Sequence, residues 1–221
     1  RTFGHLILLL RRYGEHLQIN ALPAVTLIVL TTITSARANS DVIQILALGD
    51  SLTAGYGLSQ SEAFPTRLAV ALREKGIATE IVNAGVSGDT TSGALQRLDW
   101  LLDRPFKLAI VELGANDALR AVSPDLTRQN LETIIRKLKA TGTTVLLAGM
   151  KAPRNLGPDF AKEFDPIFPE LAKSLDLQFY PFFLDGVAAD PYLNQGDGMH
   201  PNAKGVAIIV ERILPFVMRA L

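Results

Sequence analysis

Ser51 and His200 are the residues of this chain whose types best suit nucleophilic catalysis. Ser51 lies in a Gly-Asp-Ser-Leu sequence at the end of an apolar run, and His200 is the only histidine after residue 38. A serine hydroxyl is a poor nucleophile at neutral pH and needs a neighbouring base. Asp197, three residues before His200, can accept the ring Nδ1–H and leave Nε2 free to take the serine proton. These three residues predict a Ser-His-Asp hydrolase.

The tetrahedral intermediate of such a reaction also needs hydrogen-bond donors for its oxyanion. Each preorganised donor is worth about 2.7–4 kcal/mol. We expect the backbone N–H groups of Ser51 and Gly85 and the side-chain amide of Asn116 to supply them. Glycine allows close approach of the backbone, and asparagine donates without adding a charge.

Each motif also has an interpretation without chemistry. Gly-Asp-Ser is a common turn, and Asp-x-x-His before a helix can be a cap. Asn116 can be an ordinary turn residue, and Gly85 can be present because the backbone there needs a positive φ. We expect Asp50, Asp89 and Asp117 to be carboxylates that cap loops. The coincidence of four motifs at strand ends with a single histidine favours the catalytic interpretation.

The elements that position these residues follow from the hydrophobic pattern. Apolar runs predict strands over residues 42–48, 77–83, 108–113, 143–148 and 178–182. Amphipathic spacing predicts two helices over 62–75 and 90–103, and a third that begins with a Ser123 cap and ends at Gly142. It also predicts a fourth helix that is bent at Pro166 and Pro169, and a last helix that starts at Pro201. This alternation predicts one α/β domain with a parallel sheet between two layers of helices.

Ligands of such sheets bind outside the carboxyl ends of the strands. The loops after the first three predicted strands and the loop that carries His200 should therefore meet at one rim.

Several classes of site and protein are excluded by what the sequence lacks. Without cysteine, the chain has no disulfide, no thiolate metal site and no cysteine nucleophile. A metal site would need clustered histidines or carboxylates, and only one histidine follows residue 38. We therefore expect no metal, and we expect no other cofactor. The Gly-x-Ser-x-Gly elbow of a typical α/β-hydrolase, the phosphate-binding loop and the dinucleotide fingerprint are also missing.

Residues 1–38 have the pattern of a secretory signal peptide. Arg11 and Arg12 precede an uncharged stretch over 19–35, and Ala36-Arg37-Ala38 then supplies a small-x-small cleavage site. We predict cleavage after Ala38, a mature domain over 39–221, and a periplasmic or secreted protein. An uncleaved membrane anchor is the alternative, but the apolar run over 21–30 is shorter than the roughly 20 residues a span needs.

Removal of residues 1–38 takes away four arginines and one glutamate, which leaves 18 basic and 21 acidic residues. A mildly acidic domain without a basic run offers no electrostatic basis for binding nucleic acid.

At these residues the chain resembles the GDSL, or SGNH, hydrolase family. Four blocks in the family's order carry the resemblance across residues 41–214: Gly-Asp-Ser-Leu, Asn-Ala-Gly-Val-Ser-Gly-Asp-Thr, Val-Glu-Leu-Gly-Ala-Asn-Asp and Asp-Gly-Met-His-Pro-Asn. The four positions that name the family match Ser51, Gly85, Asn116 and His200, and Asp197 fits the acid of the triad.

The longer strings are similar to the bacterial thioesterase I, lysophospholipase and arylesterase branch. This similarity implies a flavodoxin-like α/β/α sandwich with a five-stranded parallel sheet, export, and an acyl-enzyme mechanism without metal or cofactor. It implies activity on small-molecule aryl esters, acyl-CoA thioesters and lysophospholipids. In that branch the loop after strand four lines the acyl crevice, which assigns substrate binding to Met150, Pro153 and Leu156; ordinary loop packing is the alternative.

We expect the mature domain to be a monomer without a stable membrane anchor. Two other functions stay open on the same fold. One is a carbohydrate O-acetyl esterase, and the other is a non-catalytic periplasmic lipid-binding module.

Overall fold

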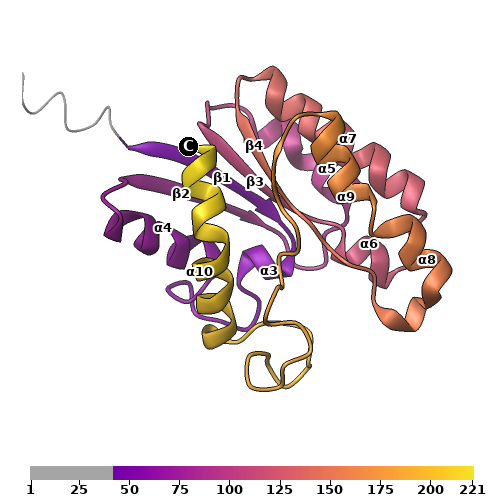
Figure 1. The fold of residues 1–221 in the computed structure, drawn as a ribbon. Coiled ribbons are helices and arrows are strands. Elements are labelled where there is room, and N and C mark those ends of the chain that lie inside the picture. Colours follow the sequence, from indigo (N-terminus) through magenta and orange to yellow (C-terminus); the bar gives the residue numbers. More distant parts are fainter. Residues whose placement is uncertain (1–41) are drawn as a thin grey trace, which may run out of the picture. The chain divides into compact units, whose positions relative to one another are not determined.

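A five-stranded parallel sheet forms the centre of the domain, with the strand order β2-β1-β3-β4-β5 (Figure 1). The computed structural model describes residues 42–221, so the predicted signal peptide lies outside the described residues. The strands are β1 (Ile43–Gly49), β2 (Thr79–Gly85), β3 (Leu108–Glu112), β4 (Thr144–Ala148) and β5 (Gln178–Tyr180). This order is the flavodoxin-like arrangement.

The strands are apolar because helices cover both faces of the sheet. All residues of β3 and the last five of β1 are buried, as expected for strands covered on two sides. In the register, Gly49 of β1 pairs with Gly85 of β2 and with Glu112 of β3. The three strands therefore end at the same level, and the loops that follow them start side by side.

Two layers of helices enclose this sheet (Figure 1). One layer holds α4 (Phe64–Glu74) and α10 (Ala203–Ala220), which pack against each other. The other holds α5 (Thr91–Leu101), α7 (Pro124–Ala140) and α9 (Ile167–Ser174), and α7 contacts both neighbours. The remaining helices are α3 (Ser51–Ala54), α6 (Ala115–Leu119), α8 (Gly157–Phe164) and the 3₁₀ helix η2 (Arg154–Leu156). The predicted three-layer α/β/α fold is confirmed.

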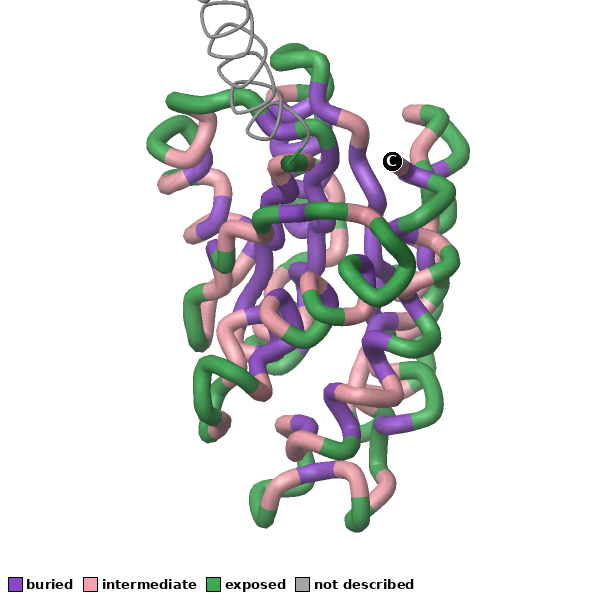
Figure 2. Tube along the Cα trace, turned by 90° about the vertical axis from the view of Figure 1, so that its left-hand side faces the viewer, coloured by how far each residue is buried: buried purple, intermediate pink, exposed green. Residues whose placement is uncertain are grey.

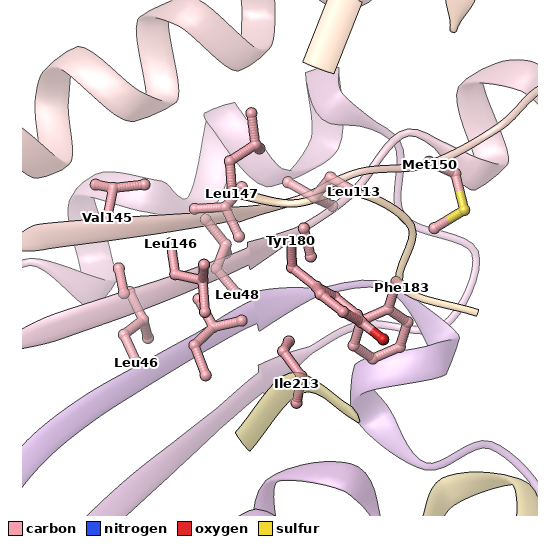
Figure 3. Close-up of a cluster of buried hydrophobic side chains, with 14 of the residues drawn as sticks. Leu46, Leu48, Leu113, Val145, Leu146, Leu147, Met150, Tyr180, Phe183 and Ile213 are labelled. Carbon is pink, nitrogen blue, oxygen red and sulfur yellow. The ribbon is translucent and has the colours of Figure 1, made fainter. Parts of the chain in front are cut away.

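Buried residues follow the strands through the centre of the domain (Figure 2). Leu46 and Leu48 of β1, Leu146 of β4 and Ile213 of α10 belong to one cluster and have no exposed surface (Figure 3). Burial of each such side chain contributes about 1.5–3 kcal/mol. Met150, which follows β4, is 4% exposed and extends this cluster to the carboxyl edge of the sheet.

The structure corrects three details of the predicted helices. The bent helix is two helices, α8 and α9, which separate before Ile167, and Pro169 lies in the first turn of α9, where proline is tolerated. The last helix begins at Ala203 rather than Pro201, because the Asn202 side chain accepts the first free N–H groups as its cap. Ser123 precedes α7, but its hydroxyl makes no capping hydrogen bond.

The described helices, over residues 42–221, include none with the length and apolar character needed to cross a bilayer.

Candidate active site

Ser51, His200 and Asp197 form a continuous chain of hydrogen-bonding atoms at the carboxyl edge of the sheet. Ser51 is the first residue of α3, directly after β1, whereas the other two lie in the loop before α10. His200 Nε2 lies 2.9 Å from Ser51 Oγ, and His200 Nδ1 lies 2.6 Å from Asp197 Oδ2. This geometry lets the imidazole accept the serine proton while the carboxylate orients the ring.

Asp197 is held in its ionised form. Its Oδ1 accepts the backbone N–H groups of His200 at 3.0 Å and Met199 at 2.9 Å. The backbone bond from His200, then the ring contact and the bond from Met199, lower the pKa of Asp197 to about 2. A permanent negative charge beside Nδ1 favours the tautomer with the proton on that atom and stabilises the imidazolium.

One side-chain amide links the His200 loop to the segment that follows Ser51, and another links two parts of the loop itself. Gln195 Nε2 donates to the carbonyl of Tyr56 at 2.7 Å, and Asn194 Nδ2 donates to the carbonyl of Val187 at 2.7 Å. The Tyr56 ring lies against His200, with 4.5 Å between ring centroids. The imidazole is therefore oriented from two sides, by the carboxylate and by the tyrosine ring.

Asn116 reaches the site from α6, the short helix that follows β3. Gly114 precedes α6 with a φ of 109°, a left-handed conformation that favours glycine. Asn116 Nδ2 donates to Asp50 Oδ2 at 3.0 Å, which leaves the second amide hydrogen available. Asn116 and Ser51 line the same cavity, so Asn116 is in reach of a group bound beside the serine.

Gly85, expected as an oxyanion donor, does not line this cavity. Its N–H donates to Asn83 Oδ1 at 3.0 Å, and its φ is not positive. A Cβ at Gly85 would lie 2.2 Å from the backbone nitrogen of Ala54. Glycine is needed here because β2 and α3 approach each other closely.

Gly88, a residue that the sequence motifs did not single out, occupies the place expected of Gly85. It lines the cavity together with Ser51, Asn116 and His200. Its φ is 79°, and its carbonyl accepts a hydrogen bond from Arg120 Nη2 at 2.8 Å. Among residues 42–221, no protein atom accepts a hydrogen bond from the Gly88 N–H. The sequence signal was a second glycine in the same strand-end loop.

The cavity beside Ser51 has a volume of about 900 Å³ and mostly apolar walls. Met150 and Pro153 line it, as expected. Leu156 does not line it, because the η2 turn places this side chain against the hydrophobic core. Residues 42–221 bring together no group of three side chains suited to hold a metal ion.

Glu112, the last residue of β3, is a further group at the site that the sequence did not reveal. It has no exposed surface, and its Oε2 accepts hydrogen bonds from Thr53 Oγ1 at 2.7 Å and from the Asp50 N–H at 3.4 Å. Burial and then the Asp50 charge raise the pKa of Glu112 well above its usual value, and burial raises the pKa of Asp50 to about 6. This upward shift favours the protonated form of Glu112.

The three aspartates expected to cap loops do bind their neighbours. Asp50 accepts from the Leu52 N–H at 3.0 Å. Asp89 pairs with Arg97 at 2.7 Å, and the buried Asp117 accepts the Thr91 N–H at 2.9 Å. Of the three, Asp50 is also linked directly to the site, because it accepts a hydrogen bond from the Asn116 side chain.

Comparison with known proteins finds similarity over most of the chain. Residues 47–208 match the model of the GDSL-like Lipase/Acylhydrolase family. The chain is 39% identical to thioesterase 1/protease 1/lysophospholipase L1 of Escherichia coli K12, over 83% of this chain and 86% of that protein. It is 36% identical to an arylesterase of Vibrio mimicus, over 80% of this chain and 90% of the other. AlinE4, an SGNH-hydrolase family esterase of known structure, is 49% identical with a TM-score of 0.70, over 82% of this chain and 98% of that one.

Glu112→Gln should make stability less dependent on pH. An acid whose pKa is raised by folding keeps its proton while the unfolded chain releases it, so its stabilising effect is lost as pH rises from the unfolded pKa towards the folded one. The variant has no such proton, so its free energy of unfolding should fall less steeply than that of the wild type between about pH 5 and 8. Urea denaturation across this range measures the two slopes.

The exposed Glu74, at the end of α4, supplies the matched control as Glu74→Gln. This variant should keep the wild-type slope. Equal slopes for Glu112→Gln and the wild type would show that Glu112 does not hold a proton in the folded state.

Proposed function

Because this chain belongs to the GDSL-like lipase/acylhydrolase family, we propose that Ser51, His200 and Asp197 are its catalytic triad. The enzyme is a GDSL-type esterase of the thioesterase I, lysophospholipase and arylesterase branch. The observation that carries the assignment is the contact between Ser51 Oγ and His200 Nε2, at 2.9 Å across 149 residues of sequence.

The triad converts one difficult hydrolysis into two acyl transfers. Ser51 Oγ attacks the acyl carbonyl carbon as His200 Nε2 takes its proton, which forms a tetrahedral intermediate and an imidazolium. The imidazolium then gives its proton to the departing oxygen or sulfur as the bond from that atom to the acyl carbon breaks. Water attacks the resulting acyl-enzyme by the same route in reverse and releases the acid and free Ser51.

We assign the oxyanion hole to the N–H groups of Ser51 and Gly88 and to the side-chain amide of Asn116. The N–H of Ser51 lies in the first turn of α3, where backbone donors have no partner within the helix. Gly88 replaces Gly85 in this assignment because it borders the cavity, whereas the Gly85 N–H is bonded to Asn83.

The size and polarity of the cavity favour acyl chains longer than acetyl. Its walls include Leu119, Met150, Phe182 and Met199, and apolar walls bind hydrocarbon. We therefore assign carboxylic esters and thioesters of such chains, including aryl esters, acyl-CoA and lysophospholipids, as the substrates. Met150 and Pro153 belong to the acyl-binding wall, and Leu156 supports it from the core side.

We assign residues 1–38 to an export signal and the mature protein to the periplasm or the medium, as a monomer. The support is the arginine pair, the uncharged stretch and the small-x-small site before Asn39.

Ser51→Ala and His200→Ala should each lower kcat by about 10³-fold or more, because either change removes the activated nucleophile. The assay is the hydrolysis of p-nitrophenyl octanoate by the purified protein, with p-nitrophenyl acetate in parallel. The wild type should act faster on the octanoyl ester; a preference for acetyl would favour the O-acetyl esterase.

A fluorophosphonate should label the wild type and not Ser51→Ala. Absence of labelling in the wild type would favour a lipid-binding module without catalysis.

Gly88→Ala should lower kcat for the same ester by about 10-fold or more, since a Cβ disfavours the left-handed φ and turns the N–H away from the oxyanion. The matched control is Gly142→Ala, between α7 and β4. Gly142 also has a φ of 79°, and neither Cβ would meet an atom closer than 3.5 Å. Both variants should lose about 1 kcal/mol of stability, but only Gly88→Ala should lose rate. Equal kcat values in the two variants would remove Gly88 from the oxyanion hole.

Expression of the full chain in a Gram-negative host should yield a periplasmic protein that begins at or near Asn39, because the predicted cleavage site follows Ala38. Mass spectrometry of the periplasmic fraction measures this start. Recovery of a protein that retains residues 1–38 would contradict cleavage.

A further inference from the structure

The cavity beside Ser51 presents positive charge to solvent along one wall. Outside the proposed triad, the charged residues that line it are Asp50, Lys151 and Arg154. Asp50 has no exposed surface and is bonded to Asn116, whereas Lys151 and Arg154 are exposed. A ligand that enters the cavity therefore meets two cations and no exposed carboxylate outside the triad.

Both cations belong to one segment whose position is held by the rest of the fold. This segment follows β4, and the Ala152 N–H donates to Asp165 Oδ1 at 2.8 Å. Lys151 Nζ lies 4.9 Å from the centroid of the Phe182 ring, within the range of a cation–π contact. Arg154 starts the η2 turn. The ammonium and the guanidinium thus project from an anchored stretch of four residues.

No carboxylate of the described residues cancels these two charges. Within residues 42–221, neither Lys151 nor Arg154 has an acidic oxygen within 4.0 Å. Asp165, close in sequence, instead accepts the backbone N–H of Ala152. The charge at this wall is therefore available to a ligand.

We propose that Lys151 and Arg154 form a subsite for a phosphate group in the leaving group of the substrate. The inference rests on the proposed function, in which the acyl part is hydrocarbon and suits the apolar walls. Negative charge then belongs to the departing alcohol or thiol. Lysine supplies a compact charge and arginine a planar pair of donors, a combination that suits phosphate oxygens.

Two kinds of leaving group share this chemistry: the thiol of coenzyme A and the glycerophosphate head of a lysophospholipid. The subsite faces solvent, where salt screens its attraction. We therefore expect a gain of about 10-fold in kcat/KM for phosphate-bearing substrates at low salt, through faster encounter and tighter binding.

Octanoyl-CoA and octanoyl-pantetheine share the acyl chain and the thioester, and only octanoyl-CoA carries the phosphates and adenosine of coenzyme A, so the salt dependence of their ratio reports the contribution of the phosphate charge. In the double variant Lys151→Gln with Arg154→Gln, the ratio of kcat/KM for octanoyl-CoA to that for octanoyl-pantetheine should fall about 10-fold at low salt. High salt should bring the wild-type ratio towards that of the variant. A control variant, Lys75→Gln with Lys173→Gln, removes two exposed charges near the amino ends of β2 and β5 and should keep the wild-type ratio.

A second pair, 1-octanoylglycerol-3-phosphate and 1-octanoylglycerol, which differ by the phosphate alone, distinguishes the source of the phosphate. If the kcat/KM ratio falls in the double variant only for this pair, the subsite is supported with a lipid head group as its ligand. If the ratio falls only for the first pair, the subsite is supported with coenzyme A as its ligand. Unchanged ratios in both pairs, or equal losses on substrates with and without phosphate, would overturn the subsite. Absence of Ser51-dependent hydrolysis of octanoyl-pantetheine by the wild type would instead overturn the proposed function.

Discussion

The hydrogen bond between Ser51 and His200 joins segments 149 residues apart, and the parallel sheet is what makes this contact possible. The carboxyl ends of parallel strands all lie at the same edge of the sheet, so the loops that follow the strands start there. β1 and β3 are neighbours at the point where the strand order reverses, which is where such sheets bind ligands. As a result, α3 with Ser51 and α6 with Asn116 start next to each other, and the loop after β5 crosses to them with His200.

Hydrogen bonds and burial shift the pKa values of two carboxyl groups near Ser51 in opposite directions. Asp197 accepts hydrogen bonds from two backbone N–H groups and from the imidazole, which lower its pKa to about 2 and keep its charge next to His200. Glu112 has no exposed surface, and burial raises its pKa, which favours its neutral form. The Asp197 charge thus lies beside the imidazole, where it stabilises an imidazolium.

The sheet was predictable from the sequence because strands buried on both faces appear as continuous apolar runs. Ser51 and His200 were predictable because few residues could serve as nucleophile and base. Gly85 and Gly88 were not distinguishable by residue type, since the direction of each N–H depends on φ and on the contacts with Asn83 and Arg120. Glu112 was missed because its raised pKa depends on burial against α3. In the sequence, Glu112 is a single polar residue at the end of an apolar run, and this pattern does not show that the side chain is buried.

The order of the parts along the chain has a consequence for biosynthesis. Ser51 is made early, but His200 lies 149 residues later, in the loop that leads into α10, and α10 packs against α4 and the sheet. A nascent polypeptide that ends before His200 therefore lacks the imidazole that contacts Ser51 in the folded protein. Pairing of these two side chains therefore requires synthesis of the chain at least as far as His200.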